Sequence, residues 1–392
     1  MTANMATTKP SPYTYPKQEH LSPMLLRSSI FFLLLSLITA IGHTDDKIII
    51  ADGDITGKLT TYSLAATTLK IATNINFLKL PVVITGDDQL LVFPSLTLNS
   101  STNVAKLFPD RKRRDDNYYV ADFTLREIRQ LDLFDTSATT KYDFHTTIPS
   151  LQEELGLIRT LELQFKKPVK LAIEIKYPWF YRALNKNISS LLLETIQKYG
   201  YGTGSDTLYL QSFDPEELQR IHNILLPAQN IDIPLIQLVG LNDGQETRQL
   251  HGATWDPYNY DWLFTHMGLR MVASYATAIA LPADLLFDKK GRIRLGNYIK
   301  DLHNYGLRLF IYSPQNKQQR LIAKTLPALL DLYFLQAHID GLYTASFNDV
   351  HQYLHNKQQP TTTKRGELPP FFSKLNLARP AAPDRKKITN KK

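Results

Sequence analysis

Three carboxylates occupy positions from which they could meet around a cation. Asp52 and Asp54 directly follow the apolar run Ile48–Ala51, and Glu174 lies inside the apolar run Val169–Lys176. Oxygen ligands of this kind suit Mg²⁺ or Ca²⁺, although acidic residues after a strand are also common turn formers. The sequence therefore leaves open both a metal site and an ordinary turn at the two aspartates.

A second set of polar and aromatic side chains could line a ligand pocket. Lys176, Gln211 and Gln237 lie within or at the ends of apolar runs, where they could exchange hydrogen bonds with a polar ligand. Aromatic side chains on a long loop could complete the mouth of such a pocket, although packing of the loop is their more common role. These loop aromatics are Tyr258, Tyr260 and Trp262.

The elements that must position these side chains alternate along the chain. Apolar runs of strand character are separated by amphipathic stretches, and several runs lack the polar alternation of strands that face water on one side. Eight such β-then-α units over about 300 residues predict a single (β/α)8 TIM barrel. No Gly-rich phosphate turn follows the first run, which disfavours an open doubly wound sheet. The expected strands are Ile48–Ala51, Leu78–Thr85, Val169–Lys176, Thr207–Phe213, Leu235–Gly240, Thr277–Pro282, Leu307–Ser313 and Asp340–Thr344.

The amphipathic stretches predict helices, and two long connections predict insertions. Asp214 is the expected N-cap of one helix, because its side chain can accept a hydrogen bond from a free backbone N–H. Residues 94–160 and 242–260 are too long for simple connections, so we expect an insertion after the second strand and a second excursion, both at the mouth. The expected helices include Ser63–Thr73, Asn187–Tyr199, Pro215–Leu225 and Leu295–Tyr305.

The net charge of +8 is not carried by the expected barrel. Residues 356–392 hold ten Lys or Arg and two Asp or Glu, and residues 1–44 add +2, so residues 45–355 sum to −2. This distribution argues against a nucleic-acid-binding surface. The absence of cysteine excludes disulfides, thiolate metal ligands and a cysteine nucleophile.

The two ends of the chain predict an export segment and a tail. Ile30–Ile41 is almost wholly apolar, follows Arg27 and ends in small residues, which predicts a signal peptide and a periplasmic or secreted protein. An uncleaved membrane anchor is the alternative, although a span needs about 20 residues. The tail is expected to be disordered and could bind an anionic membrane surface. The predicted parts are thus the N-terminal segment 1–44, the barrel 45–355 and the basic tail 356–392.

A series of motifs runs from about Lys47 to about Tyr353. It includes Thr85-Gly86-Asp87-Asp88-Gln89-Leu90, Phe108-Pro109-Asp110-Arg111, Ile173-Glu174-Ile175-Lys176, Pro178-Trp179-Phe180, Tyr209-Leu210-Gln211-Ser212-Phe213-Asp214, Asn259-Tyr260-Asp261-Trp262 and Asp340-Gly341-Leu342-Tyr343-Thr344. Their order and spacing resemble the bacterial exported type of glycerophosphodiester phosphodiesterase. The resemblance implies a (β/α)8 barrel with an insertion after the second strand, and a place in lipid and glycerol metabolism.

The resemblance also implies hydrolysis of a glycerophosphodiester to an alcohol and glycerol 3-phosphate. This reaction needs two imidazoles for proton transfer and a divalent cation held by carboxylates. The family supplies them from a His-Arg-Gly after the first strand, a Glu-x-Asp on the second, a His-Asp shortly after and a Glu on the third.

This chain departs from the family at nearly all of these positions. Only Glu174 and its neighbour Lys176 match, so we expect no catalytic residue here. His145 is the nearest histidine in sequence, and a loop histidine is usually just solvated. The replacements are Ala51-Asp52-Gly53 for His-Arg-Gly, Thr61-Tyr62-Ser63 for the following Glu-His-Thr, Lys79 and Pro81 for the Glu-x-Asp pair, and Pro94-Ser95 for His-Asp.

Lys79 could pair with Glu174 and replace the charge of the missing cation, or it could merely neutralise that carboxylate. The leading hypothesis is a catalytically degenerate family member, without a cofactor, that binds a phosphate-containing ligand or a protein partner. One alternative is an active phosphodiesterase whose rebuilt site, Asp52, Asp54 and Glu174, holds calcium or magnesium. The other is a structural or adhesion scaffold whose basic tail is the working part.

Overall fold

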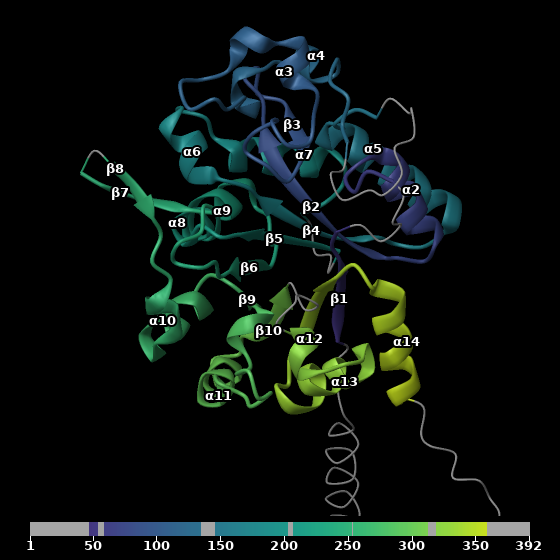
Figure 1. Cartoon of the computed structure of the whole chain (residues 1–392), viewed down its shortest axis with the longest axis vertical. Helices are drawn as coiled ribbons and strands as arrows, with labels where there is room; N and C mark the ends of the chain where they lie inside the picture. The colour runs from purple at the N-terminus through teal and green to yellow at the C-terminus, as the bar shows by residue number, and fades with distance from the viewer. Residues whose placement is uncertain are drawn as a thin grey trace, which may run out of the picture.

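The described residues form a closed barrel of parallel strands (Figure 1). The computed structural model describes residues 47–53, 59–134, 146–202, 207–252, 254–312 and 319–358. Within these ranges the first strand pairs with the last on one side and with the second on the other, which closes the ring. The barrel strands are β1 (Ile48–Ala51), β2 (Phe77–Ile84), β4 (Lys170–Ile175), β5 (Leu208–Ser212), β6 (Leu235–Leu238), β9 (Ala278–Pro282), β10 (Arg308–Tyr312) and β11 (Gly341–Thr344). The predicted (β/α)8 fold and all eight predicted strands are confirmed.

The barrel has two apolar cores, because successive residues of a strand face opposite sides of the sheet. The inner core contains Ile50, Phe77, Ala172, Tyr209 and Phe310, all nearly inaccessible to water. The outer core lies between the sheet and the helices and takes the alternate positions of the same strands. This alternation fixes which polar side chains can reach the barrel interior.

The helices pack around the outside of the strands, and several begin where the sequence predicts. Asp214 caps its helix by accepting a hydrogen bond from the Glu217 N–H, as expected, and Ser63 caps another by accepting from the Ala66 N–H. The outer helices include α2 (Leu64–Ala72), α5 (Leu151–Phe165), α6 (Pro178–Ala183), α7 (Ile188–Lys198), α8 (Pro215–Arg220), α9 (Leu226–Gln229), α10 (His266–Ala273), α11 (Gly296–Asn304), α12 (Gln319–Ile322), α13 (Leu326–Asp331) and α14 (Phe347–Gln358). Between α8 and α9, residues Ile221–Leu225 form a π-helical turn.

Both long connections carry structure of their own beyond the carboxyl ends of the strands. After β2 the chain forms β3 (Leu90–Val92), which is antiparallel to β2, and the short helices α3 (Val104–Leu107) and α4 (Leu125–Ile128). After β6 it forms a hairpin of β7 (Arg248–His251) and β8 (Thr254–Pro257). In Figure 1 the first insertion, with α3 and α4, lies at the top of the picture, and the hairpin of β7 and β8 projects to the left.

The predicted export or anchor segment, Ile30–Ile41, and most of the predicted tail lie outside the described residues. The last helix, α14, continues to Gln358, slightly past the expected end of the barrel at residue 355. Among the helices in the described ranges, none is both long and apolar enough to span a membrane.

Candidate functional site

Four charged side chains meet inside the carboxyl end of the barrel. Each lies two residues after an inward-facing position, so strand alternation directs it to the interior: Asp52 follows Ile50, Lys79 follows Phe77, and Glu174 and Lys176 continue from Ala172. Their strands are neighbours, since β2 pairs with β1 on one side and with β4 on the other. We call Asp52, Lys79, Glu174 and Lys176 the charge cluster.

The Lys79 ammonium lies between the two carboxylates of the cluster. Its Nζ is 3.1 Å from Asp52 Oδ2 and 2.9 Å from Glu174 Oε2. The second ammonium, Lys176 Nζ, is 2.9 Å from the other oxygen of Glu174. The Glu174 side chain is 2% exposed, whereas those of Lys79 and Lys176 are 17% and 12% exposed, so water reaches the cations but hardly the central carboxylate.

These contacts keep the central groups of the cluster charged. Burial acts to raise the pKa of Glu174, but the two ammonium groups outweigh it and lower that pKa to about 2. Burial likewise acts to lower the pKa of Lys79, and the carboxylates of Asp52 and Glu174 overcome this and raise it well above its usual value. The pKa of Lys176 is raised by Glu174 against the same effect of burial. Neither lysine can serve as a neutral amine nucleophile near neutral pH.

Tyrosines that the sequence reasoning did not select surround the cluster. Tyr62 donates its hydroxyl proton to Asp52 Oδ1 over 3.3 Å. The Tyr343 ring centre is 5.8 Å from Lys79 Nζ, and the Tyr343 hydroxyl donates to Gln211 Oε1. Burial raises the pKa of both phenols, so both stay protonated. Counting alternate positions outward from Gly341 would have placed Tyr343 inside the barrel, so this residue could have been found.

Of the two predicted glutamines, one faces the barrel interior and the other does not. Gln211 is fully buried next to Tyr343, and its Nε2 has no hydrogen-bond partner within the described residues. Gln237 lies between the inward-facing Ile236 and Leu238 and therefore points outward. Its Oε1 accepts from the Tyr275 hydroxyl over 2.8 Å, and its Nε2 donates to the Leu238 carbonyl. Gln237 therefore faces the outer helices and does not line the mouth, contrary to the prediction.

The loop aromatics pack mainly against one another. The Trp262 Nε1–H donates to the Tyr258 hydroxyl over 3.0 Å, and the Tyr258 and Tyr260 ring centres are 4.9 Å apart. Tyr260 also donates to the Phe213 carbonyl over 3.0 Å, which ties the loop to the end of β5. At the mouth, Lys176 Nζ instead lies 4.8 Å and 5.6 Å from the ring centres of Tyr177 and Phe213.

The charge cluster does not fit a divalent cation. The Lys79 ammonium contacts both Asp52 and Glu174, so a cation bridging these carboxylates would meet a positive charge at the same place. Asp54 lies outside the described residues, so the three-carboxylate site stays a prediction, as does any role of His145. Among the described residues no group of three His, Asp or Glu side chains is placed to hold a metal.

The charge cluster combines two cationic donors with two carboxylates. The ammonium N–H groups of Lys79 and Lys176 are donors. Glu174 stays ionised near neutral pH, and the adjacent phenols of Tyr62 and Tyr343 stay protonated, because of the pKa shifts given above. His303 contacts Asp340 at the amino end of β11, and His251 contacts Asp256 on the hairpin. General acid–base catalysis needs a group that titrates near the working pH, and the pKa values of Lys79, Glu174 and Lys176 are displaced away from neutrality.

Comparisons with known proteins agree with this fold. A family model described as the glycerophosphoryl diester phosphodiesterase family matches residues 57–346. A protein of Treponema pallidum named glycerophosphodiester phosphodiesterase is 31% identical over 322 residues, which are 77% of this chain and 90% of the relative. A protein of the same name from Haemophilus influenzae is 33% identical over 286 residues, which are 68% of this chain and 79% of the relative.

Solved structures share the barrel at low sequence identity. An Oleispira antarctica phosphodiesterase in complex with the product sn-glycerol-3-phosphate is 15% identical, with a TM-score of 0.53 over 79% of this chain and 96% of that one. A glycerophosphodiester phosphodiesterase of Parabacteroides distasonis is 14% identical, with a TM-score of 0.50 over 80% of this chain and 99% of that one. At this identity the likeness shows the fold alone.

Proposed function

The chain belongs to the glycerophosphoryl diester phosphodiesterase family, and we propose that its barrel binds a phosphate-containing ligand without hydrolysing it. The observation that carries this proposal is the Lys79 ammonium, held between Asp52 and Glu174 at 3.1 Å and 2.9 Å. By the family pattern this position would carry a carboxylate for the metal. A fixed ammonium keeps positive charge at the mouth but cannot activate water as a metal does.

The charge balance of the cluster supports an anionic ligand. Asp52, Lys79, Glu174 and Lys176 sum to zero, so the cluster carries no net negative charge that would repel a phosphate. Lys176 is the stronger candidate donor, because its described charged contact is with Glu174 alone, whereas Lys79 contacts two carboxylates.

A binding experiment tests the role of Lys176. Titration of the full chain with sn-glycerol-3-phosphate in a calorimeter should give saturable binding, and Lys176→Gln should weaken it about tenfold or more, since a hydrogen bond to a charged group is worth about 1.5–3 kcal/mol. Lys198→Gln is the matched control, because Lys198 is exposed at the last residue of α7. Equal binding by the wild type and Lys176→Gln would sink the proposal.

The second candidate function is glycerophosphodiester hydrolysis with a metal at the rebuilt site, and the names of the two relatives favour the hydrolysis. An assay with glycerophosphocholine and added calcium separates the two functions. We expect turnover no higher than in a metal-free control. Calcium-dependent turnover that Glu174→Gln abolishes would instead establish an active enzyme with a rebuilt site.

We also propose that the protein is exported, and that the tail contributes contact with an anionic surface. The sequence Ile30–Ile41 supports the first point and the +8 charge of residues 356–392 supports the second. N-terminal sequencing of the mature protein tests export, and a start inside residues 1–41 would contradict cleavage. Deletion of residues 356–392 tests the scaffold alternative. It should abolish the phenotype if the tail is the working part, whereas the other two functions predict little change.

A further inference from the structure

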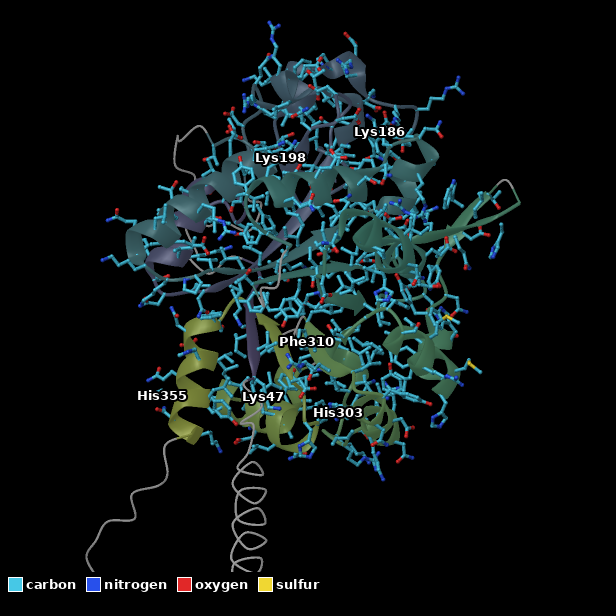
Figure 2. All side chains as sticks on the ribbon, turned by 180° about the vertical axis from the view of Figure 1, so that it is seen from behind. Lys47, Lys186, Lys198, His303, Phe310 and His355 are labelled. Atoms are coloured by element: carbon cyan, nitrogen blue, oxygen red, sulfur yellow. The ribbon has the colours of Figure 1, made fainter. Side chains whose placement is uncertain are left out.

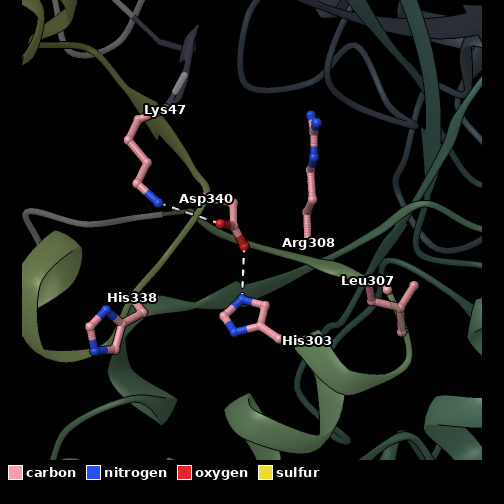
Figure 3. A pocket seen from close by; sticks show the side chains of 7 residues that line it. Lys47, His303, Leu307, Arg308, His338 and Asp340 are labelled. Carbon is pink, nitrogen blue, oxygen red and sulfur yellow. Dashed lines mark hydrogen bonds and ion pairs between the residues drawn. The ribbon is translucent and has the colours of Figure 1, made fainter. Parts of the chain in front are cut away.

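A polar pocket lies at the amino end of the barrel, opposite the charge cluster. It has a volume of about 380 Å³ and opens where β1, β10 and β11 begin. Figure 3 shows the side chains that line it, and the basic ones come from four different segments. The lining side chains are Lys47, His303, Leu307, Arg308, His338 and Asp340.

The negative charge of Asp340, the acidic residue of the pocket, is balanced by neighbouring basic groups and hydrogen-bond donors. Asp340 Oδ1 is 3.5 Å from Lys47 Nζ, and Asp340 Oδ2 is 2.9 Å from His303 Nε2 and accepts from the Leu309 N–H over 2.8 Å (Figure 3). Burial acts to raise the pKa of Asp340, but the hydrogen bonds from His303 and Leu309 and the charge of Lys47 hold it below its usual value. Asp340 therefore stays ionised and orders Lys47 and His303 at the wall of the pocket.

Two further basic side chains of the pocket have no such partner. Arg308 begins β10 and His338 precedes β11, and both are exposed. Within the described residues neither side chain makes a hydrogen bond or ion pair, and Figure 3 draws no contact from either to Asp340. An arginine at the rim of a cavity, without a carboxylate partner, offers a planar set of N–H donors to an incoming anion.

We propose that this pocket is a second binding site, which takes a phosphate group. Its described lining carries the basic side chains of Lys47 and Arg308 and two imidazoles against the single carboxylate of Asp340. In Figure 3 the Arg308 side chain points away from Asp340 and His338, and as an exposed side chain without a partner among the described residues it would turn toward the pocket to bind two phosphate oxygens through its fork. The Asp340 contacts hold Lys47 and His303 in place before the anion enters, so little side-chain entropy is lost on binding.

The position of the pocket allows two sources for this phosphate. Figure 2 places Lys47, His303 and His355 at one end of the molecule and Lys186 at the other. The described chain begins at Lys47 and ends on α14 at Gln358, so the apolar segment Ile30–Ile41 and the basic tail both join the fold near this end. The ligand is therefore either a free phosphate compound or the headgroup of an anionic lipid.

Inorganic phosphate tests the site itself. The full chain, labelled with nitrogen-15 in histidine, is titrated with inorganic phosphate, and the ring signals of His303 and His338 are followed. Both should shift and saturate, and Arg308→Gln should weaken the apparent affinity about tenfold or more. Arg308→Lys should retain part of the binding, because it keeps the charge and loses the fork. Asp45 and Asp46 precede Lys47 and lie outside the described residues, so the experiment uses a chain that contains them.

Two variants make this experiment specific. Arg126→Gln removes an exposed charge on α4, at the opposite end of the barrel, and should leave the titration unchanged. Lys176→Gln should also leave it unchanged, since this proposal does not rest on the function of the charge cluster. Signals that do not saturate, or an equal loss in Arg308→Gln and Arg126→Gln, would overturn the phosphate site.

Vesicles distinguish the two sources. The full chain is floated with vesicles of phosphatidylcholine and phosphatidylglycerol, with and without saturating inorganic phosphate. If the pocket holds a lipid headgroup, phosphate and Arg308→Gln should each lower the bound fraction. If neither changes it while the ring signals still saturate, the pocket takes a soluble phosphate compound. Both results support the site and assign its ligand.

Discussion

The Lys79 ammonium lies 2.9 Å from Glu174 Oε2, inside a barrel where the family pattern would place a carboxylate at each position. Substitution of an acid by a base at one of two facing positions converts mutual repulsion into a buried ion pair. Such a pair persists without a metal, whereas two facing carboxylates would need a cation to stay ionised. The two lysines of the charge cluster therefore balance its two carboxylates without a bound cation.

Removal of the central carboxylate should destabilise the fold strongly. Glu174→Gln leaves the Lys79 and Lys176 ammonium groups with one carboxylate, that of Asp52, and an uncompensated buried charge costs about 3–5 kcal/mol. Unfolding in urea at pH 7 measures the free energy of unfolding. Glu194→Gln, an exposed change on α7, should alter it by less than about 0.5 kcal/mol. A loss of similar size in both variants would show that the ion pair contributes little.

The same variant predicts a pH dependence. The folded pKa of Glu174 is about 2, below its ordinary value of 4.5, so its contribution to stability is present above about pH 4.5 and is lost as the pH falls towards 2. The difference in free energy of unfolding between the wild type and Glu174→Gln should therefore narrow across this window. A difference that stays constant down to pH 2 would contradict the assignment.

Restoring an acid at residue 79 should restore metal binding. Lys79→Glu places a third carboxylate beside Asp52 and Glu174, so the variant should be less stable than the wild type without metal and should gain thermal stability with calcium. The wild type should show no calcium-dependent shift of its melting temperature. Lys198→Glu is the control for adding a carboxylate at the surface. A calcium shift in the wild type would instead favour the rebuilt metal site.

A buried glutamate between two outer helices predicts that stability falls towards neutral pH. Glu154 of α5 is 1% exposed, accepts from the Thr67 hydroxyl of α2 and has its Oε2 unpaired within the described residues. Burial raises its pKa to about 7, although Thr67 and Lys70 act in the opposite direction. A carboxyl group whose pKa is higher in the folded than in the unfolded protein stabilises the fold at any pH below its unfolded pKa. This contribution is lost as the pH rises through the folded pKa.

Glu154→Gln tests this dependence. Relative to Glu154→Gln, the wild type should lose about 3 kcal/mol of stability between pH 4.5 and 7, because the pKa of Glu154 is raised from 4.5 to about 7 in the folded protein. The amide does not titrate, so the variant should lack this loss and be the more stable protein above pH 7. Urea unfolding at a series of pH values measures the free energy of unfolding of the wild type and of Glu154→Gln, with Glu194→Gln as control. Parallel curves for the wild type and Glu154→Gln would contradict the prediction.

The fold could be predicted because short stretches of sequence identify each strand and helix. The site depends instead on which side of the sheet each side chain faces. Continuous apolar runs identified the barrel strands, and Asp214 identified a helix start. Gln211 and Gln237 lie in similar runs, yet one faces the interior and the other the helices, because their strands differ in register by one position. The Arg308 pocket was missed because its residues come from the amino ends of strands, which sequence motifs for catalysis do not mark.

The hydrogen bond between the buried side chains of Gln211 and Tyr343 should contribute to the stability of the barrel interior. Tyr343 donates to Gln211 Oε1, and both side chains are almost inaccessible to water. Gln211→Leu leaves the Tyr343 hydroxyl without this acceptor, and Tyr343→Phe leaves the Gln211 oxygen without this donor, so each should cost about 1–3 kcal/mol. The double variant removes both partners and should cost less than the sum, with a coupling of about 1 kcal/mol or more. Urea unfolding of the four proteins gives the coupling directly. Additive losses would mean that water or other groups replace each lost partner, and that the inner tyrosine is not fixed by this hydrogen bond.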